Sequence, residues 1–183
     1  METKLYCSHK LLNTYKSIKI EPLPSAEEQA YHMNSWNVNY LVYERKKIWF
    51  FVHSITRYTV LIPDVKASDL PVLRDRLLLH LDKQFNTGVA SHGPKGINLE
   101  KAESLIGPLK FHPTNNDKSC ISYLNQRMES FRYYHHMDMP YGEIDFDKVG
   151  ANFSFICGMK RGNRSVNIYP SEEMHELIKR WDE

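Results

Sequence analysis

The sequence has few cysteines and no long apolar segment, and each absence excludes a class of protein. Its three cysteines, Cys7, Cys120 and Cys157, lie far apart in 183 residues, and this odd, scattered set is a poor disulfide framework. We therefore expect reduced thiols and a cytoplasmic protein. The longest apolar runs, Ile48–Val52 and Leu77–Leu81, are far shorter than the roughly 20 residues that cross a bilayer. The first seven residues contain no apolar segment, so no secretory signal is expected.

A marked excess of charge of one sign is also missing. Lys and Arg total 24 and Asp and Glu total 22, which gives a formal net charge of +2. A strongly basic nucleic-acid module is therefore not expected, although a local basic patch passes this test. Hydrophobic residues make up 42% of the chain and charged residues 25%, as in ordinary globular domains. We predict one soluble domain over residues 1–183, with a possible lobe boundary in the loop at 88–97.

The clearest β pattern covers Trp36–Leu61. Its first part alternates large apolar residues with asparagines, and the charged turn Glu44–Lys47 follows. Ile48–Val52 is continuously apolar, as expected of a strand buried on both faces. Thr56–Ile62 is rich in β-branched and aromatic residues and predicts a third strand. Because the connections are short, the three strands are predicted to form an antiparallel meander.

Helices are predicted from apolar spacing and capping residues. One apolar stripe at spacings of three and four predicts a helix; it consists of Leu70, Leu73, Leu77, Leu81 and Phe85. Further helices are expected after Ser8, Asn98, Asp145 and Ser171 and over Ser119–His136, with strands at Leu5–Cys7 and Ser165–Tyr169. A strand over Asn152–Cys157 is an alternative to the end of the helix that follows Asp145, because this segment is rich in aromatic and β-branched residues. The fold class is therefore α+β, with an antiparallel sheet of three to five strands packed on one face by the Leu70–Phe85 helix and the C-terminal helices.

Several short motifs resemble a known family, over most of the chain. They are Lys10-Leu11-Leu12, Trp36 with Asn39, Arg45-Lys46-Lys47, Thr56–Val60, Asp69-Leu70, Ser119–Met128 and Tyr169–Glu172. In these motifs the sequence is similar to a set of small bacterial proteins catalogued as a domain of unknown function. The resemblance implies a one-domain α+β protein in a bacterial or phage setting, and it implies no reaction.

Two groups of residues have the types that metal sites and catalytic sites use. His135–Asp138 offers ligands common in metal sites, but neighbouring helical residues point about 100° apart. Glu143, Asp145 and Asp147 could provide an acid and a base, although acids also cap helix starts. Cys120 could act as a nucleophile but has no local signature. We expect no bound metal and no cofactor, and a metal-assisted or acid/base hydrolytic enzyme is kept as an alternative.

The leading hypothesis is a non-enzymatic binding module with a protein partner and no membrane contact, accessory to a bacterial defence, plasmid or phage system. Aromatic residues make up 12% of the chain, and Tyr and Trp are enriched at interfaces. A nucleic-acid binder is a second alternative, in which basic turns lie beside a stacking surface formed by Trp36, Tyr40, Tyr43 and Tyr58. The residues that we predict for binding are Arg45, Lys47, His53, Thr56, Arg57, Asn125 and His135.

Overall fold

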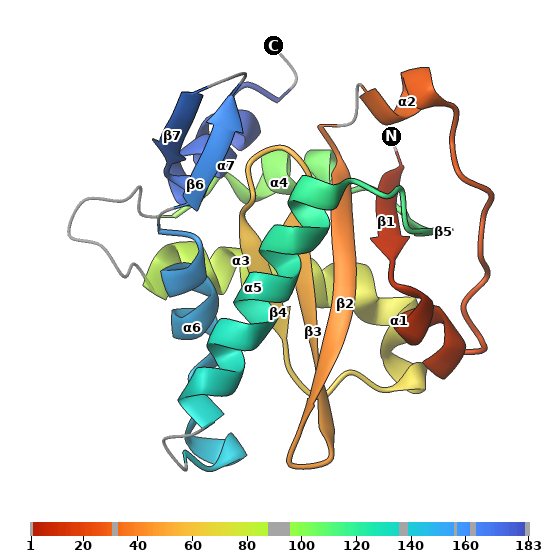
Figure 1. Cartoon of the computed structure of the whole chain (residues 1–183), viewed down its shortest axis with the longest axis vertical. Helices are drawn as coiled ribbons and strands as arrows, with labels where there is room; N and C mark the ends of the chain where they lie inside the picture. Colours follow the sequence, from red (N-terminus) through yellow and green to blue (C-terminus); the bar gives the residue numbers. More distant parts are fainter. Residues whose placement is uncertain are drawn as a thin grey trace.

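The computed structural model describes residues 2–30, 33–87, 96–135, 139–155, 157–161 and 164–181 (Figure 1). Its centre is a five-stranded sheet with the strand order β4-β3-β2-β1-β5. The strands are β1 (Thr3–Cys7), β2 (Ser35–Tyr43), β3 (Lys46–His53), β4 (Thr59–Ile62) and β5 (Leu109–Pro113).

The predicted meander is confirmed: β2 pairs antiparallel with β3, and β3 pairs antiparallel with β4. The β2–β3 turn consists of Glu44 and Arg45, whose φ angles are 45° and 65°. Two central residues with positive φ form the tight turn whose twist matches that of the flanking strands. The charged residues Lys46 and Lys47, which were predicted to be part of the turn, are instead the first residues of β3.

The prediction of a purely antiparallel sheet is wrong, because β1 pairs in parallel with both of its neighbours, β2 and β5. The strand β5 was not predicted. Pro108 and Pro113 bracket a segment of mixed polarity there, which hides the alternation that marks a strand. The outer edge of β5 is covered by the chain that follows α1 (His9–Thr14), through a bridge between Ile20 and Phe111.

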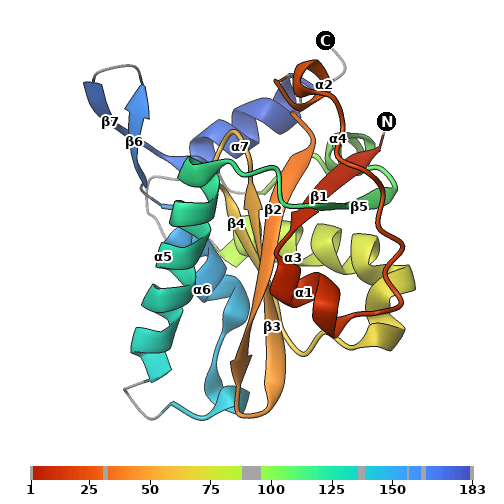
Figure 2. The same cartoon turned by 45° about the vertical axis from the view of Figure 1, so that its right-hand side comes forward.

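Helices cover both faces of the sheet, so the prediction of one helical layer is also wrong (Figure 2). One layer contains α1, α3 (Leu73–Thr87), α4 (Leu99–Leu105) and α7 (Pro170–Lys179), and the opposite layer contains α5 (Lys118–His135) and α6 (Phe146–Phe153). Shorter helical turns are α2 (Ala26–Ala30), η1 (Ala67–Val72) and η2 (Tyr141–Glu143). The predicted leucine helix is confirmed, with its first residues in η1.

A second layer is needed because β3 is apolar on both sides. Trp49 and Phe51 join the cluster that packs beneath Leu77 and Leu81 of α3. The residues between them, Ile48, Phe50 and Val52, join a second cluster with Leu124, Met128 and Phe131 of α5. All five of these β3 side chains are completely buried. The first cluster also includes Met174 and Ile178 of α7, so it combines residues from both sides of the 88–97 loop. The lobe boundary itself stays a prediction, because residues 88–95 lie outside the described ranges.

The free edge of β4 is covered by side chains of the helical layers. Thr59 donates its backbone N–H to Ser154 Oγ at 2.9 Å. With its amide turned so that the nitrogen faces Thr59 O and the oxygen faces Leu61 N, Gln84 donates to Thr59 O at 3.0 Å and accepts from Leu61 N at 3.2 Å. A Cβ on Gly150 would lie 2.4 Å from that amide, so any side chain at this position of α6 would have to displace the Gln84 amide from the edge of β4. Covering an edge in this way prevents pairing with other chains.

A separate antiparallel hairpin projects from the main sheet (Figure 1). It consists of β6 (Cys157–Arg161) and β7 (Arg164–Ile168). The strand predicted over Ser165–Tyr169 is confirmed in its main part, whereas β6 was not predicted over its length.

Candidate functional site

One half of the α5 side of the sheet is polar. β1 contributes Lys4 and Tyr6 to this half, and Tyr6 is in register with Asn37 of β2 and His112 of β5. The other half of the same face, over β3 and β4, is apolar and covered by α5 and α6. Neighbouring strands at the same register place their side chains on one face, so this face of the sheet carries polar side chains over β5, β1 and β2, and Tyr6, Asn37 and His112 are buried there. We call this surface the polar half.

The polar half borders a point where the chain connectivity changes direction. After β1 the chain enters α1 on one face of the sheet, and after β5 it enters α5 on the opposite face. β1 and β5 are adjacent and parallel, so the two connections diverge from neighbouring carboxyl ends. In open sheets with parallel strands, such a divergence leaves a crevice, and ligands bind there.

The structure has a cavity of about 180 Å³ beside these strand ends, between β1, β2 and the first half of α5. We call it the crevice. Its described lining contains hydroxyl, amide and imidazole groups with a few apolar side chains, and no Lys, Arg, Asp or Glu. The lining residues are Tyr6, Ser8, His9, Asn37, Val38, Asn39, Thr114, Ile121, Leu124 and Asn125. The lining has no charged carboxylate, ammonium or guanidinium group and most of its accessible surface is apolar, so it suits an uncharged group rather than an ion.

Local hydrogen bonds hold part of the crevice wall in place. Ser8 caps α1 by accepting from Leu11 N at 3.2 Å, and its hydroxyl donates to Asn39 Oδ1 at 2.7 Å. Asn39 Oδ1 also accepts from Tyr40 N at 2.9 Å. His9 and Asn125 are exposed at the rim. The wall is therefore preorganised, while the rim groups stay available to a ligand.

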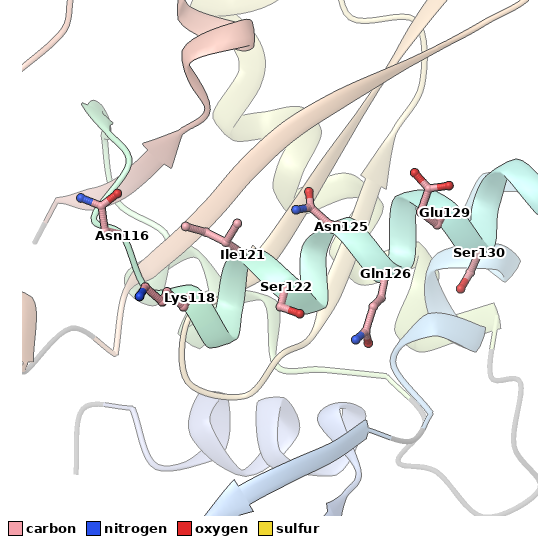
Figure 3. Close-up of a pocket in the computed structure, with 8 residues that line it drawn as sticks. All are labelled: Asn116, Lys118, Ile121, Ser122, Asn125, Gln126, Glu129 and Ser130. Atoms are coloured by element: carbon pink, nitrogen blue, oxygen red, sulfur yellow. The ribbon is translucent and has the colours of Figure 1, made fainter.

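The crevice borders a larger, shallow and open hollow along the outer side of α5, whose described lining comes from α5 and the turn before it (Figure 3). Ile121 and Asn125 line both spaces. The groove has a volume of about 870 Å³, and we call it the α5 groove. Most of its described lining is again amide or hydroxyl, with one cation and one anion. The remaining lining residues are Asn116, Lys118, Ser122, Gln126, Glu129 and Ser130.

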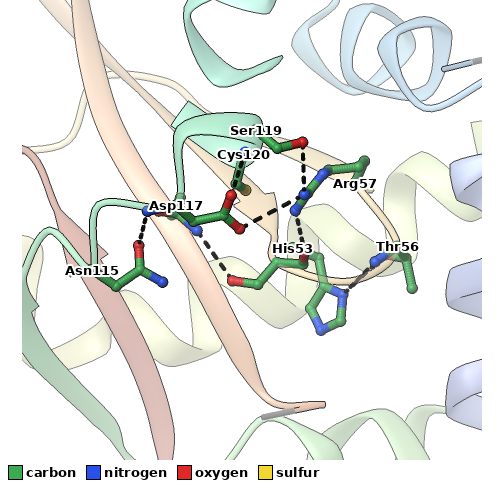
Figure 4. Close-up of polar contacts among 9 residues, drawn as sticks. His53, Thr56, Arg57, Asn115, Asp117, Ser119 and Cys120 are labelled. Carbon is green, nitrogen blue, oxygen red and sulfur yellow. Dashed lines mark hydrogen bonds and ion pairs between the residues drawn. The ribbon is translucent and has the colours of Figure 1, made fainter. Parts of the chain in front are cut away.

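The start of α5 is fixed by a second group of polar residues (Figure 4). Asp117 caps the helix, because its carboxylate accepts from Cys120 N at 3.0 Å. The same carboxylate lies 3.7 Å from the guanidinium of Arg57, which also bonds Ser119 Oγ at 3.3 Å and the carbonyl of Ser54. Arg57 is 5% exposed and has a φ of 62°. The group therefore anchors α5 to the turn between β3 and β4.

The chain's family follows from a comparison with known families. A family model described as a domain of unknown function (DUF6933) matches residues 4–173. The chain belongs to the DUF6933 family. The match covers β1 and α5 and therefore includes the crevice, the α5 groove and the Arg57 anchor. No curated protein and no solved structure matches the chain significantly. The resemblance inferred from the sequence motifs is thus confirmed at the level of the family.

In this DUF6933 member the binding residues predicted from sequence do not converge. Only Asn125 lines the crevice. Arg45 is exposed in the β2–β3 turn, and Lys47 lies 5.1 Å from the ring centre of Tyr15. His135 is the last residue of α5, ten residues beyond Asn125 and therefore about 15 Å along the helix.

His53 and Thr56 bond one another in the interior. His53 Nδ1 accepts from Thr56 N at 3.2 Å and lies 3.0 Å from its hydroxyl, while Nε2 donates to the carbonyl of Met33 at 2.9 Å. Burial lowers the pKa of His53 to about 4, because a charged imidazole loses its hydration there. Together with Arg57, these two residues stabilise the end of the meander instead of facing a ligand.

The predicted aromatic stacking surface does not form. All four of its rings are buried, with exposures between 1% and 5%; they are Trp36, Tyr40, Tyr43 and Tyr58. Bases need an open ring face to stack on, so these residues cannot bind single-stranded nucleic acid by stacking. The side chains of Arg161 and Arg164 in the second basic turn lie outside the description.

The candidate catalytic residues have structural partners. Asp145 caps α6 by accepting from Lys148 N at 2.9 Å, and Asp147 lies 2.7 Å from His80 Nδ1. Burial raises the pKa of the Cys120 thiol to about 12, which leaves almost no thiolate at neutral pH. Residues 136–138, the rest of the metal-like string, lie outside the described ranges. Among the described residues no cluster of three His, Cys, Asp or Glu residues could hold a metal ion, and no helix is long and apolar enough to span a membrane.

Sequence reasoning missed most of the crevice, because its walls come from four distant segments. Ser8, Asn39, Thr114 and Asn125 are brought together only by the parallel pairing of β1. One signal was present in the sequence. Asn37 and Asn39 lie on the same face of β2 as Leu41, two residues further along the strand, and Leu41 is buried in the second apolar cluster. Polar residues on a strand face that is elsewhere apolar indicate an interruption of the core.

Proposed function

We propose that this protein is a non-enzymatic binding module that holds an extended segment of a partner polypeptide along the crevice and the α5 groove. The observation that carries the proposal is that the two spaces are neighbours and share Ile121 and Asn125 in their linings. A small cavity at the strand ends beside a longer, shallow groove suits one anchoring side chain followed by several residues of chain. The proposed setting is a bacterial cytoplasm, where the protein serves a defence, plasmid or phage system.

The chemistry of the lining supports a polypeptide over other polymers. Asn and Gln side chains each offer a donor and an acceptor, as a peptide group does, and the groove has Asn125 and Gln126 on adjacent positions of α5. Its one lysine, Lys118, is balanced by Glu129. A nucleic acid would require several cations along its backbone, so this lining favours a ligand with little net charge.

The proposed cytoplasmic setting is supported by the cysteines. Cys7 and Cys120 are free and buried, and burial raises the pKa of both thiols. Such residues act as small apolar side chains and need no oxidising compartment.

Selection from a random peptide library displayed on phage tests the proposal. We expect wild-type protein to enrich a shared peptide motif whose binding is weakened about tenfold by Asn125→Ala, since a lost hydrogen bond of about 1 kcal/mol and part of the contact area disappear together. Asn13→Ala is the matched control, because Asn13 is an exposed helical asparagine on α1, in the opposite helical layer. This control should bind the selected peptide as the wild type does.

Three results would count against the proposal. The first is that the selection enriches no shared motif. The second is that Asn125→Ala binds the selected peptide as tightly as the wild type does. The third is that Asn13→Ala weakens binding of the peptide as much as Asn125→Ala does. A single-stranded oligonucleotide tested at low salt provides a further arm. Saturable binding of that oligonucleotide with a steep dependence on salt would favour the nucleic-acid alternative and would overturn the polypeptide assignment.

A further inference from the structure

The polar residues in the crevice wall use many of their polar atoms within the protein. Asn37 Nδ2 donates to Ser54 Oγ at 3.1 Å, and Thr114 Oγ1 accepts a backbone N–H at 3.3 Å. The hydroxyl of Ser8 donates to Asn39 Oδ1 at 2.7 Å. A polar atom that is bonded within the wall has less capacity left for a ligand. These residues therefore face the crevice largely through carbon, which explains why most of its accessible surface is apolar.

Aliphatic side chains complete the lining of the crevice. They come from β2 and from the inner side of α5, and they are Val38, Ile121 and Leu124. A charged side chain placed among these groups would lose its hydration and would meet no opposite charge in the described lining, which is strongly unfavourable. An apolar side chain loses no hydrogen bond there and is removed from water. The interior of the crevice therefore favours an apolar group.

The volume of the crevice limits the size of that group. The crevice measures about 180 Å³, and an apolar cavity of about 150 Å³ is large enough for one benzene ring. The branched side chains of leucine and isoleucine, the chain of methionine and the ring of phenylalanine all fall within this limit. The fused rings of tryptophan are larger than a single six-membered ring. The crevice therefore has room for one apolar side chain of up to phenyl size.

The rim of the crevice differs from its interior. His9 and Asn125 are exposed there, and no hydrogen bond within the described part of the chain engages either side chain. Asn125 also lines the α5 groove, so it lies where a bound chain would pass from one space to the other. A side-chain amide has a donor and an acceptor side by side. It can thus accept from the N–H and donate to the C=O of the bound chain.

We infer that the anchor in the crevice is one apolar side chain of leucine, isoleucine, methionine or phenylalanine, and that the amide of Asn125 bonds the main chain beside it. This inference rests on the proposed function, and it names the residue class that the partner polypeptide must contain. An apolar interior with polar groups at its rim is the arrangement that protein interfaces use around a buried anchor. The neutral lining excludes Asp, Glu, Lys and Arg as the anchor, and the volume excludes Trp.

Single residues capped as N-acetyl methylamides are suitable probes, because each carries one side chain between two peptide groups. Protein-observed NMR with probes at up to about 10 mM detects even millimolar affinity. We expect the Leu, Ile, Met or Phe probe to shift the methyl signals of Val38 and Leu124. The Ala probe should bind about tenfold more weakly than the Leu probe or worse, because it buries fewer carbon atoms. The Asp, Lys and Trp probes should not shift these signals.

Two variants that change the crevice volume should change the order of the probes. Ile121→Ala enlarges the crevice and should shift the preference toward the Phe and Trp probes. Thr114→Leu narrows the crevice and should weaken the Phe probe about tenfold relative to the Leu probe; it is the second variant if Ile121→Ala does not fold. Leu79→Ala is the matched control, because Leu79 is a half-exposed apolar residue of α3, in the opposite helical layer. This control should leave the order of the probes unchanged.

N-methylation of the Leu probe tests the role of Asn125. Methylation of one of its two peptide nitrogens should weaken binding to the wild type about tenfold, because the N–H that Asn125 accepts is lost. The same methylation should have no further effect on Asn125→Ala, since a double-mutant cycle shows coupling only between groups that interact. An equal loss in both proteins would show that Asn125 does not bond the main chain.

The inference is overturned if no apolar probe shifts the signals of the crevice, if the Asp or Lys probe binds as tightly as the Leu probe, or if neither volume variant changes the order of the probes. These failures differ from a failure of the proposed function. A selected peptide that depends on a charged anchor would keep the polypeptide proposal and overturn the apolar anchor. A bound Leu probe with no selected peptide would keep the apolar site and overturn the polypeptide proposal.

Discussion

The two halves of the α5 side of the sheet differ in what their side chains do. Over β3 and β4, Ile48, Phe50 and Val52 are completely buried under α5 and α6. Over β1 and β5, the same face has Lys4 and Lys110 beside a cavity of about 380 Å³, and Tyr6 beside the crevice of about 180 Å³. The two halves also differ in strand pairing, which is antiparallel over β3 and β4 and parallel on both sides of β1. The helices α5 and α6 thus cover the apolar strands, and the cavities lie beside the polar ones.

The largest expected effect comes from a change in the apolar half. Phe131 is completely buried on α5 and contacts Tyr43, Phe50 and Phe146 at ring-centre distances of 5.7–6.1 Å. Phe131→Ala should lower the free energy of unfolding by about 3–5 kcal/mol through lost burial and a cavity. Urea unfolding followed by circular dichroism measures this loss.

Two matched variants sharpen the comparison. Tyr133→Ala alters the same helix at a position that is 77% exposed, and Lys110→Ala alters the polar half. Both should change the free energy of unfolding by less than about 0.5 kcal/mol. If Lys110→Ala destabilises the protein as much as Phe131→Ala does, the division of the face into a structural half and a binding half is incorrect.

The same contrast explains which parts of the molecule the sequence predicts. The meander and the leucine helix were predicted because their signals are local, such as the alternation before Glu44 and the stripe from Leu73 to Phe85. The caps at Ser8, Asn98 and Asp145 were predicted for the same reason, and each accepts the expected backbone bond. Apolar periodicity thus specifies the packed half well.

The polar half has no comparable signal. β5 is five residues long, with Pro108 directly before it and Pro113 as its last residue, and its parallel partner β1 lies more than 100 residues earlier. Pairing between strands that are so far apart along the chain leaves no pattern in the local sequence of either strand. The crevice depends on this pairing, so of the predicted binding residues only Asn125 belongs to it. His53 and Arg57, which were predicted to bind a ligand, are instead buried and form hydrogen bonds and ion pairs within the protein.

Acidification should distinguish the interior from the polar half. His53 has a pKa of about 4 in the folded protein because of burial, against an ordinary value of 6.5. The unfolded chain therefore binds a proton more readily, and this contribution to stability is present above pH 6.5 and lost as the pH falls toward 4. The difference corresponds to about 3 kcal/mol. Urea unfolding at several pH values measures it.

Variants of two histidines assign that pH dependence. His53→Gln should flatten the decline between pH 6.5 and 4 relative to wild type, because glutamine takes up no proton in either state. His9→Gln, at the exposed rim of the crevice, should leave the decline unchanged. An equal flattening by both variants, or by neither, would show that the acid sensitivity does not originate in the buried imidazole.

A smaller loss of stability than at Phe131 or His53 is expected at Asp117, where α5 begins between the two halves. Asp117→Ala removes the cap on Cys120 N and the carboxylate beside the buried Arg57. Because the Asp117 side chain is one-third exposed, we expect a loss of about 1–2 kcal/mol, close to that of a lost cap. Asp117→Asn keeps the cap acceptor and should recover much of this loss, whereas Asp75→Ala, at an exposed residue of α3, should have no measurable effect.

The same variants test peptide binding, since the first turn of α5 also carries Lys118 and Ile121 of the α5 groove. Asp117→Ala should weaken the binding of a selected peptide by more than its loss of stability alone would explain. Asp117→Asn should bind the peptide as the wild type does. Equal peptide binding by wild type and Asp117→Ala would mean that the helix start does not position the groove, and the two halves of the face would then be energetically independent.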